Sequence, residues 1–463
     1  MTDRVRRALF VVLVTWLAIA GYVLGRFAND AFPTFYLIRP LLGAIPFALL
    51  IGLVAAWRLP MQAPLAALFG VGLLTFWGTL TRHWLEAAAG LAVLAVALLV
   101  ARWRRIALAP LLRSASNAAV VFVAVFFVSG VVRAYLGAEG PVEPVVATQE
   151  ATGPNLYLVL LDGYPRRDTL LNDLGIDNAP FEEALADRGF DVYQDVVADR
   201  RYTDLTLMTL LTGSLEGVPL DTAPASEVQW EVRRALSQAA LPRLAQEAGY
   251  EYHVIDSPAG HVTFSAGTHY SGGGLNTLEE YMLTESLLGP MVDAFLPRLP
   301  TDSLRAHFDA SVDDLRGLVD PEAHRLVLAH LFQPHLPFLW DGDGSPLPVP
   351  AAWPGANLYA AQVEVLGITL DDYSAAMAGD LITLNARLLG LVDEIIARDP
   401  GAVIVLFSDH GARYSEGLKQ TEWYRTFLAA RTPDHPALFA ADPKPTNILR
   451  VLLPTYVTGD PTP

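Results

Sequence analysis

Two apolar stretches of the sequence end in side chains that commonly bind metals. "NLYLVLLDG" (155–163) ends with Asp162 and a glycine, and "AVIVLFSDHG" (402–411) ends with Asp409, His410 and a glycine. Carboxylate oxygens and imidazole nitrogens are ordinary ligands of divalent cations. If both stretches are strands of one sheet, the three side chains can converge into a metal site. A purely structural Asp-His pair after a strand is the alternative interpretation of the second motif.

The elements that must position these side chains are buried parallel strands. Apolar runs of the same kind occur at 250–256 and 325–331, and near-continuous apolar runs are typical of strands buried on both faces of a parallel sheet. Helical periodicity lies between them, most clearly at 181–190 and 381–401. The alternation predicts an α/β domain with a mostly parallel central sheet. Ligands of such sheets bind beyond the carboxyl ends of the strands, where both motifs lie.

The N-terminal part of the chain has a different composition. Of the 463 residues 52% are hydrophobic, and residues 1–136 contain 12 Arg, no Lys and three acids, so their net charge is +9 against −26 for the remainder. Five apolar stretches lie at about 8–25, 37–57, 63–81, 85–101 and 117–132, each near the ~20 residues that cross a bilayer. We predict a transmembrane helical domain over 1–136, a Gly- and Pro-rich linker over 137–154, and a catalytic domain over 155–463.

The arginine positions predict the orientation of these spans. With the N-terminus inside, eight arginines lie in inner segments and four, Arg39 among them, in outer ones, which agrees with the positive-inside rule. This predicts a multi-pass protein of the cytoplasmic (inner) membrane with an extracytoplasmic C-terminal domain. If the first stretch is a signal peptide cleaved after Ala20, four spans remain and the domain is still outside.

Composition also excludes several classes of function. The acidic C-terminal part lacks the basic surface that nucleic acids require, so no nucleic-acid partner is expected. The absence of cysteine excludes disulfides and a cysteine nucleophile. A transporter would carry paired charges inside its spans, and none is evident in the sequence.

Four segments occur in an order that resembles a known family. They are "PNLYLVLLDGYPRRDTL", "RRYTDLTLMTLLTG", "LAHLFQPHLPF" and "LFSDHG". Together they resemble the sulfatase-like branch of the alkaline phosphatase superfamily, and within it membrane-anchored enzymes such as lipoteichoic acid synthase and lipid A phosphoethanolamine transferase. The resemblance implies an alkaline phosphatase-like fold and a sulfatase-like hydrolase or transferase activity.

The resemblance also implies roles for individual residues. One divalent metal ion, Zn²⁺ or Mn²⁺, would be held by Asp162, Asp409, His410 and Thr203, and Thr203 would be the nucleophile. His330 and His335 would be catalytic, by donating hydrogen bonds to a phosphate or by protonating the leaving oxygen. The chain departs from the transferases at Asp162, where they commonly have Glu.

Physical arguments make the threonine role plausible and leave alternatives. Thr203 opens the helical stretch "TDLTLMTLL", and a helix N-terminus favours negative charge on an alkoxide or a phosphate. Arg200 and Arg201 precede it and are predicted to bind substrate. The alternatives are that Thr203 is a helix cap and that Thr206, which has the spacing of the family motif together with Thr209, is the nucleophile.

The resulting expectation is a metal-dependent phosphotransferase or phosphodiesterase. It would move a phospho-head group from a lipid donor, such as phosphatidylglycerol or phosphatidylethanolamine, to an envelope glycan or lipid acceptor. One alternative is a sulfatase-like hydrolase of another phosphate or sulfate ester, although the sequence lacks the Cys/Ser-x-Pro-x-Arg motif that formylglycine chemistry requires. The other is a non-catalytic surface domain that kept the fold.

Overall fold

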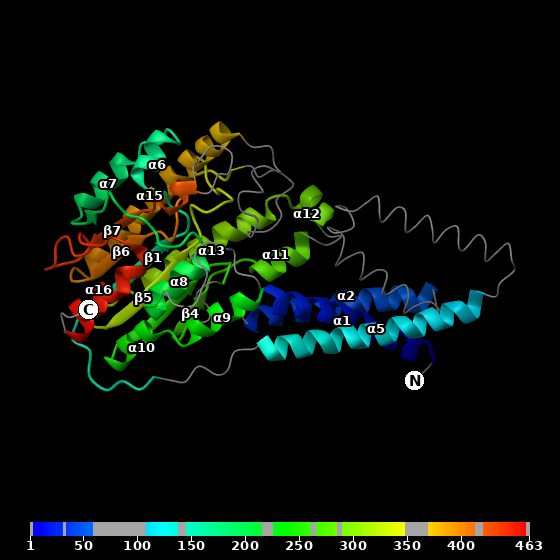
Figure 1. Ribbon diagram of the computed structural model, residues 1–463. Helices are drawn as coiled ribbons and strands as arrows, with labels where there is room; N and C mark the ends of the chain where they lie inside the picture. Colours follow the sequence, from blue (N-terminus) through cyan, green and yellow to red (C-terminus); the bar gives the residue numbers. More distant parts are fainter. Residues whose placement is uncertain are drawn as a thin grey trace. The chain divides into compact units, whose positions relative to one another are not determined.

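The computed structural model describes nine stretches of the chain, which form two compact units (Figure 1). The described residues are 3–30, 34–58, 108–137, 145–214, 226–260, 265–284, 289–347, 369–412 and 420–459. The helical unit contains the described residues up to 137 and the segment Asn276–Pro297, and the α/β unit contains the others. Most of the predicted linker, 145–154, is described and contains no helix or strand.

The helical unit is built on three long helices, α1 (Asp3–Asp30), α2 (Ile38–Arg58) and α5 (Leu108–Gly137), with the 3₁₀ turn η1 (Thr34–Leu37) between the first two. α1 packs against both others. Its contact with α5 is close at Gly21 and Gly130, because a Cβ added at Gly130 would lie 3.1 Å from the carbonyl oxygen of Gly21. Small residues allow such close packing of membrane helices. The indole of Trp16 donates a hydrogen bond to the carbonyl of Leu41 on α2, over 3.2 Å.

The apolar character of these helices agrees with the membrane prediction in part. Ala8–Ala28 of α1 and Ser114–Tyr135 of α5 are long and apolar enough to cross a membrane, and α2 contains the shorter apolar stretch Ile38–Leu50. The predicted spans 63–81 and 85–101 lie outside the described residues. The structure therefore supports three apolar helices among the five predicted spans.

The segment Asn276–Pro297 belongs to the helical unit although its neighbours in the chain belong to the α/β unit. It contains α11 (Thr277–Thr284) and α12 (Gly289–Phe295), which contact each other, and α11 also contacts α2. Arg39, at the start of α2, forms an ion pair with Glu279 of α11 at 2.5 Å. The sequence offered no reason to separate this segment from the rest of the 155–463 domain.

The α/β unit is organised around one seven-stranded sheet with the order β2-β7-β6-β1-β5-β3-β4. The strands β1, β3, β4, β5 and β6 are parallel, and β7 runs antiparallel to β6 and to β2. Their bounds are β1 Leu156–Leu161, β2 Asp191–Val192, β3 Glu251–Asp256, β4 Thr268–Ser271, β5 Arg325–Leu331, β6 Val403–Phe407 and β7 Leu428–Arg431. The prediction of an α/β domain with a mostly parallel sheet is confirmed, and the two motif-bearing strands, β1 and β6, are adjacent at its centre.

Helices cover both faces of this sheet. Tyr157, Val159 and Leu161 of β1 face one core and Leu156, Leu158 and Leu160 face the other, as the two-residue period of a strand requires. The first core is covered by α6 (Arg167–Asn172), α7 (Ala179–Ala186), α13 (Leu299–Gly317) and α15 (Leu370–Arg398). The second is covered by α8 (Thr203–Thr212), α9 (Ser226–Ser237), α10 (Ala240–Glu247) and α16 (Ile448–Leu452). The short elements η2 (Gln420–Tyr424), η3 (Pro445–Asn447) and η4 (Leu453–Thr458) complete the unit.

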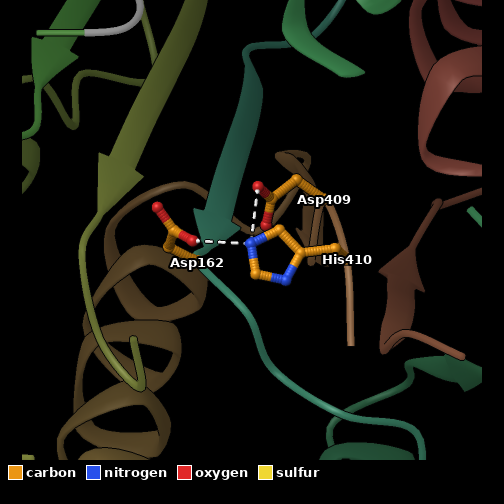
Figure 2. A group of neighbouring side chains, drawn as sticks. All are labelled: Asp162, Asp409 and His410. Carbon is orange, nitrogen blue, oxygen red and sulfur yellow. Dashed lines mark ion pairs between the residues drawn. The ribbon is translucent and has the colours of Figure 1, made fainter. Parts of the chain in front are cut away.

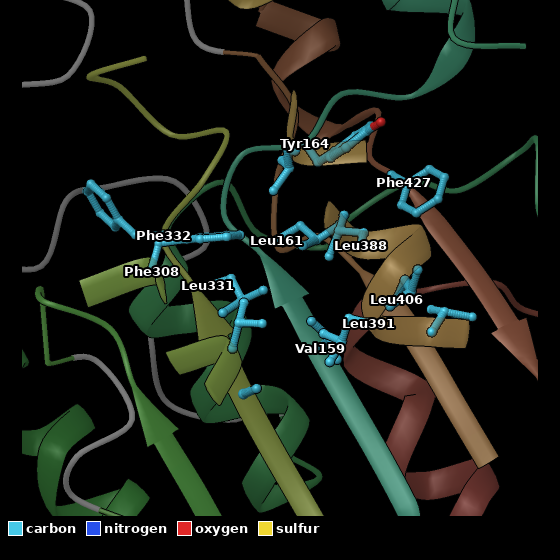
Figure 3. Close-up of a cluster of buried hydrophobic side chains, with 14 of the residues drawn as sticks. Val159, Leu161, Tyr164, Phe308, Leu331, Phe332, Leu388, Leu391, Leu406 and Phe427 are labelled. Atoms are coloured by element: carbon cyan, nitrogen blue, oxygen red, sulfur yellow. The ribbon is translucent and has the colours of Figure 1, made fainter. Parts of the chain in front are cut away.

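α15 is long and apolar enough for a membrane span, yet it is a core helix of the α/β unit. Leu388 and Leu391 are buried against the sheet residues Val159 and Leu406 (Figure 3). The helix begins at a capping box formed by Thr369 and Asp372, eleven residues before the predicted start, because its first turns are too polar to continue the apolar period.

Candidate active site

The sheet brings the two sequence motifs together at the carboxyl ends of adjacent strands. Asp162 follows the last residue of β1, and Asp409 and His410 follow β6 after one serine. One ligand atom from each of the three side chains lies within 4.8 Å of the others, and the side chains point toward one another (Figure 2). All three are at most 2% exposed. The predicted convergence of these residues is therefore present in the structure.

The carboxylates are each held through one oxygen. Asp162 Oδ2 accepts a hydrogen bond from Nε2 of His330, at the end of β5, over 3.0 Å. Asp409 Oδ1 accepts one from the backbone N–H of Gly163 over 3.1 Å. Such contacts fix the direction of the other oxygen, as outer partners do for metal ligands. His330 therefore contacts Asp162, a predicted metal ligand.

The remaining oxygens and one ring nitrogen face each other without hydrogen bonds. Asp162 Oδ1, Asp409 Oδ2 and His410 Nε2 are buried and have no hydrogen-bond partner in the described part of the chain. His410 Nε2 lies 3.2 Å from Asp162 Oδ1 and 3.5 Å from Asp409 Oδ2. His410 Nδ1 lies 2.8 Å from the carbonyl of Gly411; a carbonyl can only accept, so Nδ1 donates. A neutral His410 then directs the Nε2 lone pair at two carboxylate oxygens, a repulsive arrangement that a cation between them would relieve.

The charge balance of the cluster also indicates a cation site. Within the described residues, neither Asp162 nor Asp409 pairs with Lys or Arg; their charged partners are histidines. Burial raises the pKa of Asp162, but the charge of His335 and the hydrogen bond from His330, with His410 close by, outweigh it and hold that pKa well below its usual range. Two buried carboxylates without a fixed cation are costly. A divalent cation on the three unpaired atoms satisfies both the charge and the donor set.

The helix that carries the predicted nucleophile ends its first turn beside this cluster. Thr206 of α8 donates a hydrogen bond from Oγ1 to the carbonyl of Asp409 over 3.3 Å. Thr203 begins the helix one turn earlier, on the same face as Thr206, and its Oγ1 is buried with no hydrogen-bond partner among the described residues. The N-cap position is Tyr202, and no side chain caps the helix. Thr203 is therefore not used as a cap, and Thr206 has its hydroxyl engaged by backbone.

The two predicted substrate-binding arginines flank the start of α8. Arg200 is fully buried. The guanidinium of Arg201 lies over the rings of Tyr202, at 5.0 Å, and Trp423, at 5.5 Å. The carbonyl of Trp423 accepts a hydrogen bond from the N–H of Gly411 over 2.7 Å. Arg201 thus connects the residues before Thr203 with the segment that follows His410.

The second predicted histidine also lies by the cluster. The ring centroids of His335 and His410 are 6.3 Å apart. His335 Nδ1 donates a hydrogen bond to the carbonyl of Leu336 over 2.7 Å, which leaves Nε2 of a neutral ring as an acceptor. Gln333, between the two predicted histidines, was missed by the sequence analysis. It is 1% exposed, and its amide nitrogen has no hydrogen-bond partner in the described ranges; only its position after an apolar strand could have marked it.

The glycine after Asp162 is required by its backbone conformation. Gly163 has φ +72°, and a Cβ there would lie 3.0 Å from Cε1 of His410. Only glycine adopts this region without strain. The "LDG" motif therefore turns the chain so that the Gly163 N–H reaches Asp409 and the His410 ring fits against it.

Neither a protein-family model nor a curated relative matches the chain. Solved structures resemble it. The C-terminal periplasmic domain of EcEptC from Escherichia coli, in complex with zinc, is 17% identical with TM-score 0.41, over 69% of this chain and 86% of that one. The periplasmic domain of phosphoethanolamine transferase EptC from Campylobacter jejuni is 11% identical with TM-score 0.39, over 66% and 92%. The phosphonate monoester hydrolase of Agrobacterium radiobacter is 15% identical with TM-score 0.37, over 65% and 73%.

The structural neighbours are thus enzymes, a transferase and a hydrolase among them, and they include sulfatases. Similarities at these identities and scores assign neither a substrate nor a mechanism to this chain, so both must come from the site.

Proposed function

We propose that the chain is a membrane-anchored, metal-dependent phosphotransferase or phosphodiesterase with Thr203 as its nucleophile. The observation that carries the proposal is the meeting of Asp162, Asp409 and His410, which offer ligand atoms within 4.8 Å of one another. Each also has one buried atom without a hydrogen-bond partner in the described ranges, and Thr206 of the helix that Thr203 opens contacts Asp409. A structural cluster would be expected to satisfy these buried atoms internally. A site for a cation and a nucleophile leaves them available.

The donor set fits Zn²⁺ or Mn²⁺. Two carboxylate oxygens, one imidazole nitrogen and the Thr203 hydroxyl give a mixed oxygen and nitrogen site, which both metals accept. When bound there, the cation would lower the pKa of the hydroxyl, as metal ions do for bound water. His330 would hold Asp162 in its binding orientation through the 3.0 Å hydrogen bond, a positioning role rather than the phosphate contact that the sequence suggested.

The reaction would proceed by two displacements at phosphorus. Thr203 Oγ gives its proton to water and forms a bond to the phosphorus of a phosphodiester, and the bond from phosphorus to the leaving oxygen breaks. The alcohol leaves with a proton, for which His335 is the proposed donor once its Nε2 is protonated. An acceptor alcohol or water then attacks phospho-Thr203 and gives its proton to His335, while the bond from phosphorus to Thr203 Oγ breaks and Oγ takes a proton from water. Arg200 and Arg201, next to Thr203, would bind the phosphate charge.

The three apolar helices support a lipid donor. An enzyme held at a bilayer meets lipid phosphodiesters at high local concentration, so phosphatidylglycerol or phosphatidylethanolamine is the proposed donor. An envelope glycan or lipid would be the acceptor. The acidic α/β unit is proposed to lie outside the cytoplasmic membrane.

The decisive experiment identifies the covalent product. Purified full-length protein is incubated with phosphatidylglycerol or phosphatidylethanolamine, and intact mass and peptide mapping are measured. A mass gain on the peptide of Thr203, equal to the phospho-head group, is expected. Chelation and Thr203→Ala should each abolish the gain and the release from a chromogenic phosphodiester.

The matched control is Thr206→Val. It removes the hydroxyl that donates to Asp409 and leaves Thr203 in place, so labelling should persist at a rate reduced about tenfold or less, the size expected for one neutral hydrogen bond. Labelling lost in Thr206→Val but retained in Thr203→Ala would make Thr206 the nucleophile. Turnover that survives both Thr203→Ala and chelation would contradict the proposed function.

A further inference from the structure

An apolar surface on the segment Asn276–Pro297 is not explained by the candidate active site. Met291 and Phe295 lie four residues apart on α12, so they share a face of the helix, and Leu296 follows. Their exposed fractions are 55%, 77% and 57%. Val292, between them, is buried and anchors the helix. A soluble surface rarely presents three neighbouring large apolar side chains without a partner.

The contacts of the segment Asn276–Pro297 associate it with the predicted membrane helices. Asn276–Pro297 is part of the same compact unit as α1, α2 and α5. Of these helices, α1 and α5 contain apolar stretches long enough for a membrane, and α2 contains a shorter one. α12 contacts α11, and α11 contacts α2 (Figure 1). The Arg39–Glu279 ion pair joins α11 to the start of α2. Because the arginine distribution places Arg39 on the outer side, α11 and α12 lie at the outer end of this helix.

We propose that Met291, Phe295 and Leu296, called the α12 apolar surface, insert into the outer leaflet of the bilayer that the helical unit spans. Short amphipathic segments with Phe and Leu on one side bind at the headgroup and acyl boundary. The segment is an insertion between β4 and α13, so this contact gives the catalytic chain a second attachment to the membrane. The inference rests on the proposed membrane location and not on the proposed chemistry.

The chain is suited to a direct test because it contains no cysteine. Phe295→Cys is labelled with an environment-sensitive fluorophore, and the full-length protein is placed in nanodiscs of phosphatidylethanolamine and phosphatidylglycerol containing acyl-chain nitroxide lipid. The matched control is Leu171→Cys, an exposed apolar residue of α6 in the α/β unit. A blue-shifted emission that nitroxide lipid quenches is expected at 295, and neither effect at 171.

Three outcomes contradict the proposal. The first is equal emission and equal quenching at the two positions. The second is a label at 295 that responds to aqueous iodide but not to nitroxide lipid. The third is a blue shift at 295 that disappears when each disc contains a single copy, which indicates contact between two copies of the chain instead of lipid contact.

An activity measurement separates this proposal from the proposed function. The double variant Phe295→Asn, Leu296→Asn should raise KM for phosphatidylglycerol in vesicles at least threefold and leave turnover of a soluble chromogenic phosphodiester unchanged, since neither residue belongs to the candidate active site. Equal turnover of both substrates by variant and wild type contradicts a role for the surface in lipid use. If the wild type turns over neither substrate, the proposed function fails while the fluorescence result still decides membrane insertion.

Discussion

At the residue scale, the cluster assigns different tasks to side chains that look alike in the sequence. His410 presents an unpaired ring nitrogen to two carboxylates, whereas His330 uses its Nε2 to hold Asp162. Thr203 and Thr206 differ in the same way, since only Thr206 has a described hydrogen bond. His410 and Thr203 are therefore the candidates for direct chemistry, whereas His330 and Thr206 hold Asp162 and Asp409.

The positioning role of His330 gives a prediction about metal affinity. His330→Asn removes the donor to Asp162 Oδ2, so the apparent dissociation constant for Zn²⁺ or Mn²⁺ should rise about 10- to 100-fold, while kcat at saturating metal changes little. Metal titration of chelated protein, followed by the thermal unfolding midpoint, measures this. His253→Asn is the control, because His253 is a buried histidine on β3 that pairs with Glu251.

The opposite pattern would favour direct action of His330 on substrate. Unchanged metal affinity with a large loss of kcat at saturating metal would support the catalytic role that the sequence resemblance implied and contradict the positioning role.

Gly163 gives a second residue-scale prediction. Gly163→Ala places a Cβ at φ +72° and 3.0 Å from the His410 ring, so both the backbone and the ring must shift. We expect metal affinity to fall at least tenfold and the protein to lose about 1–2 kcal/mol of stability. Gly175→Ala is the control, since Gly175 has φ +68° with no atom within 4 Å of the added Cβ. Equal metal affinity in the two variants would show that contact with His410 is unimportant.

The sequence could predict the ligands but not their contacts. Asp162, Asp409 and His410 are recognisable because each follows an apolar strand in a motif with glycine. The hydrogen bond from His330 to Asp162 joins residues 168 positions apart, and no local pattern encodes such a pairing. Gln333 lacks a signal for the same reason: an uncharged amide after a strand becomes notable only once it is known to be buried.

At the element scale, periodicity located the central strands better than the helix ends. The predicted runs at 325–331 and 250–256 contain β5 and β3, because strands buried on both faces are continuously apolar. α15 begins earlier than predicted because a capping box and polar side chains form its first turns. The association of α11 and α12 with the helical unit was not foreseen, since it depends on contacts with a distant part of the chain.

α15 supplies a prediction about pH and stability. Burial raises the pKa of Asp380 to about 7, although the N–H groups of Leu339 and Trp340 donate to it over 2.7 and 3.0 Å. Its ordinary value is 3.8, so the folded state binds the additional proton between about pH 4 and pH 7. This proton on Asp380 stabilises the folded state by up to about 4 kcal/mol. The full stabilisation is present below about pH 4, and it is lost as the pH rises through 7.

Asp380→Asn should remove this dependence, because an amide oxygen still accepts both hydrogen bonds and does not titrate. The midpoint of thermal unfolding is measured for wild type and variant at pH 5 and at pH 8. The wild-type midpoint minus the variant midpoint should be more positive at pH 5. Taking the difference cancels the titration of the other carboxylates. A difference that is the same at both pH values would mean that Asp380 titrates normally in the folded protein.

At the scale of the whole molecule, charge separates the two halves of the chain. Residues 1–136 are rich in arginine, and the remainder has an excess of acids. This distribution suits a protein whose arginine-rich loops face the cytoplasm and whose large domain faces outward. A membrane anchor would suit the proposed activity, since an enzyme held at a bilayer meets lipid phosphodiesters at high local concentration.

The orientation can be tested with two cysteines of matched exposure. Val5, at the start of α1, is 45% exposed, and Leu171, in the α/β unit, is 46% exposed. In spheroplasts of a bacterial host, a membrane-impermeant maleimide should label Leu171→Cys in intact cells and Val5→Cys only after permeabilisation. Similar intrinsic accessibility makes the membrane the cause of any difference. Labelling of Val5→Cys alone in intact spheroplasts would reverse the topology, place the acidic unit in the cytoplasm, and remove envelope acceptors from the proposed reaction.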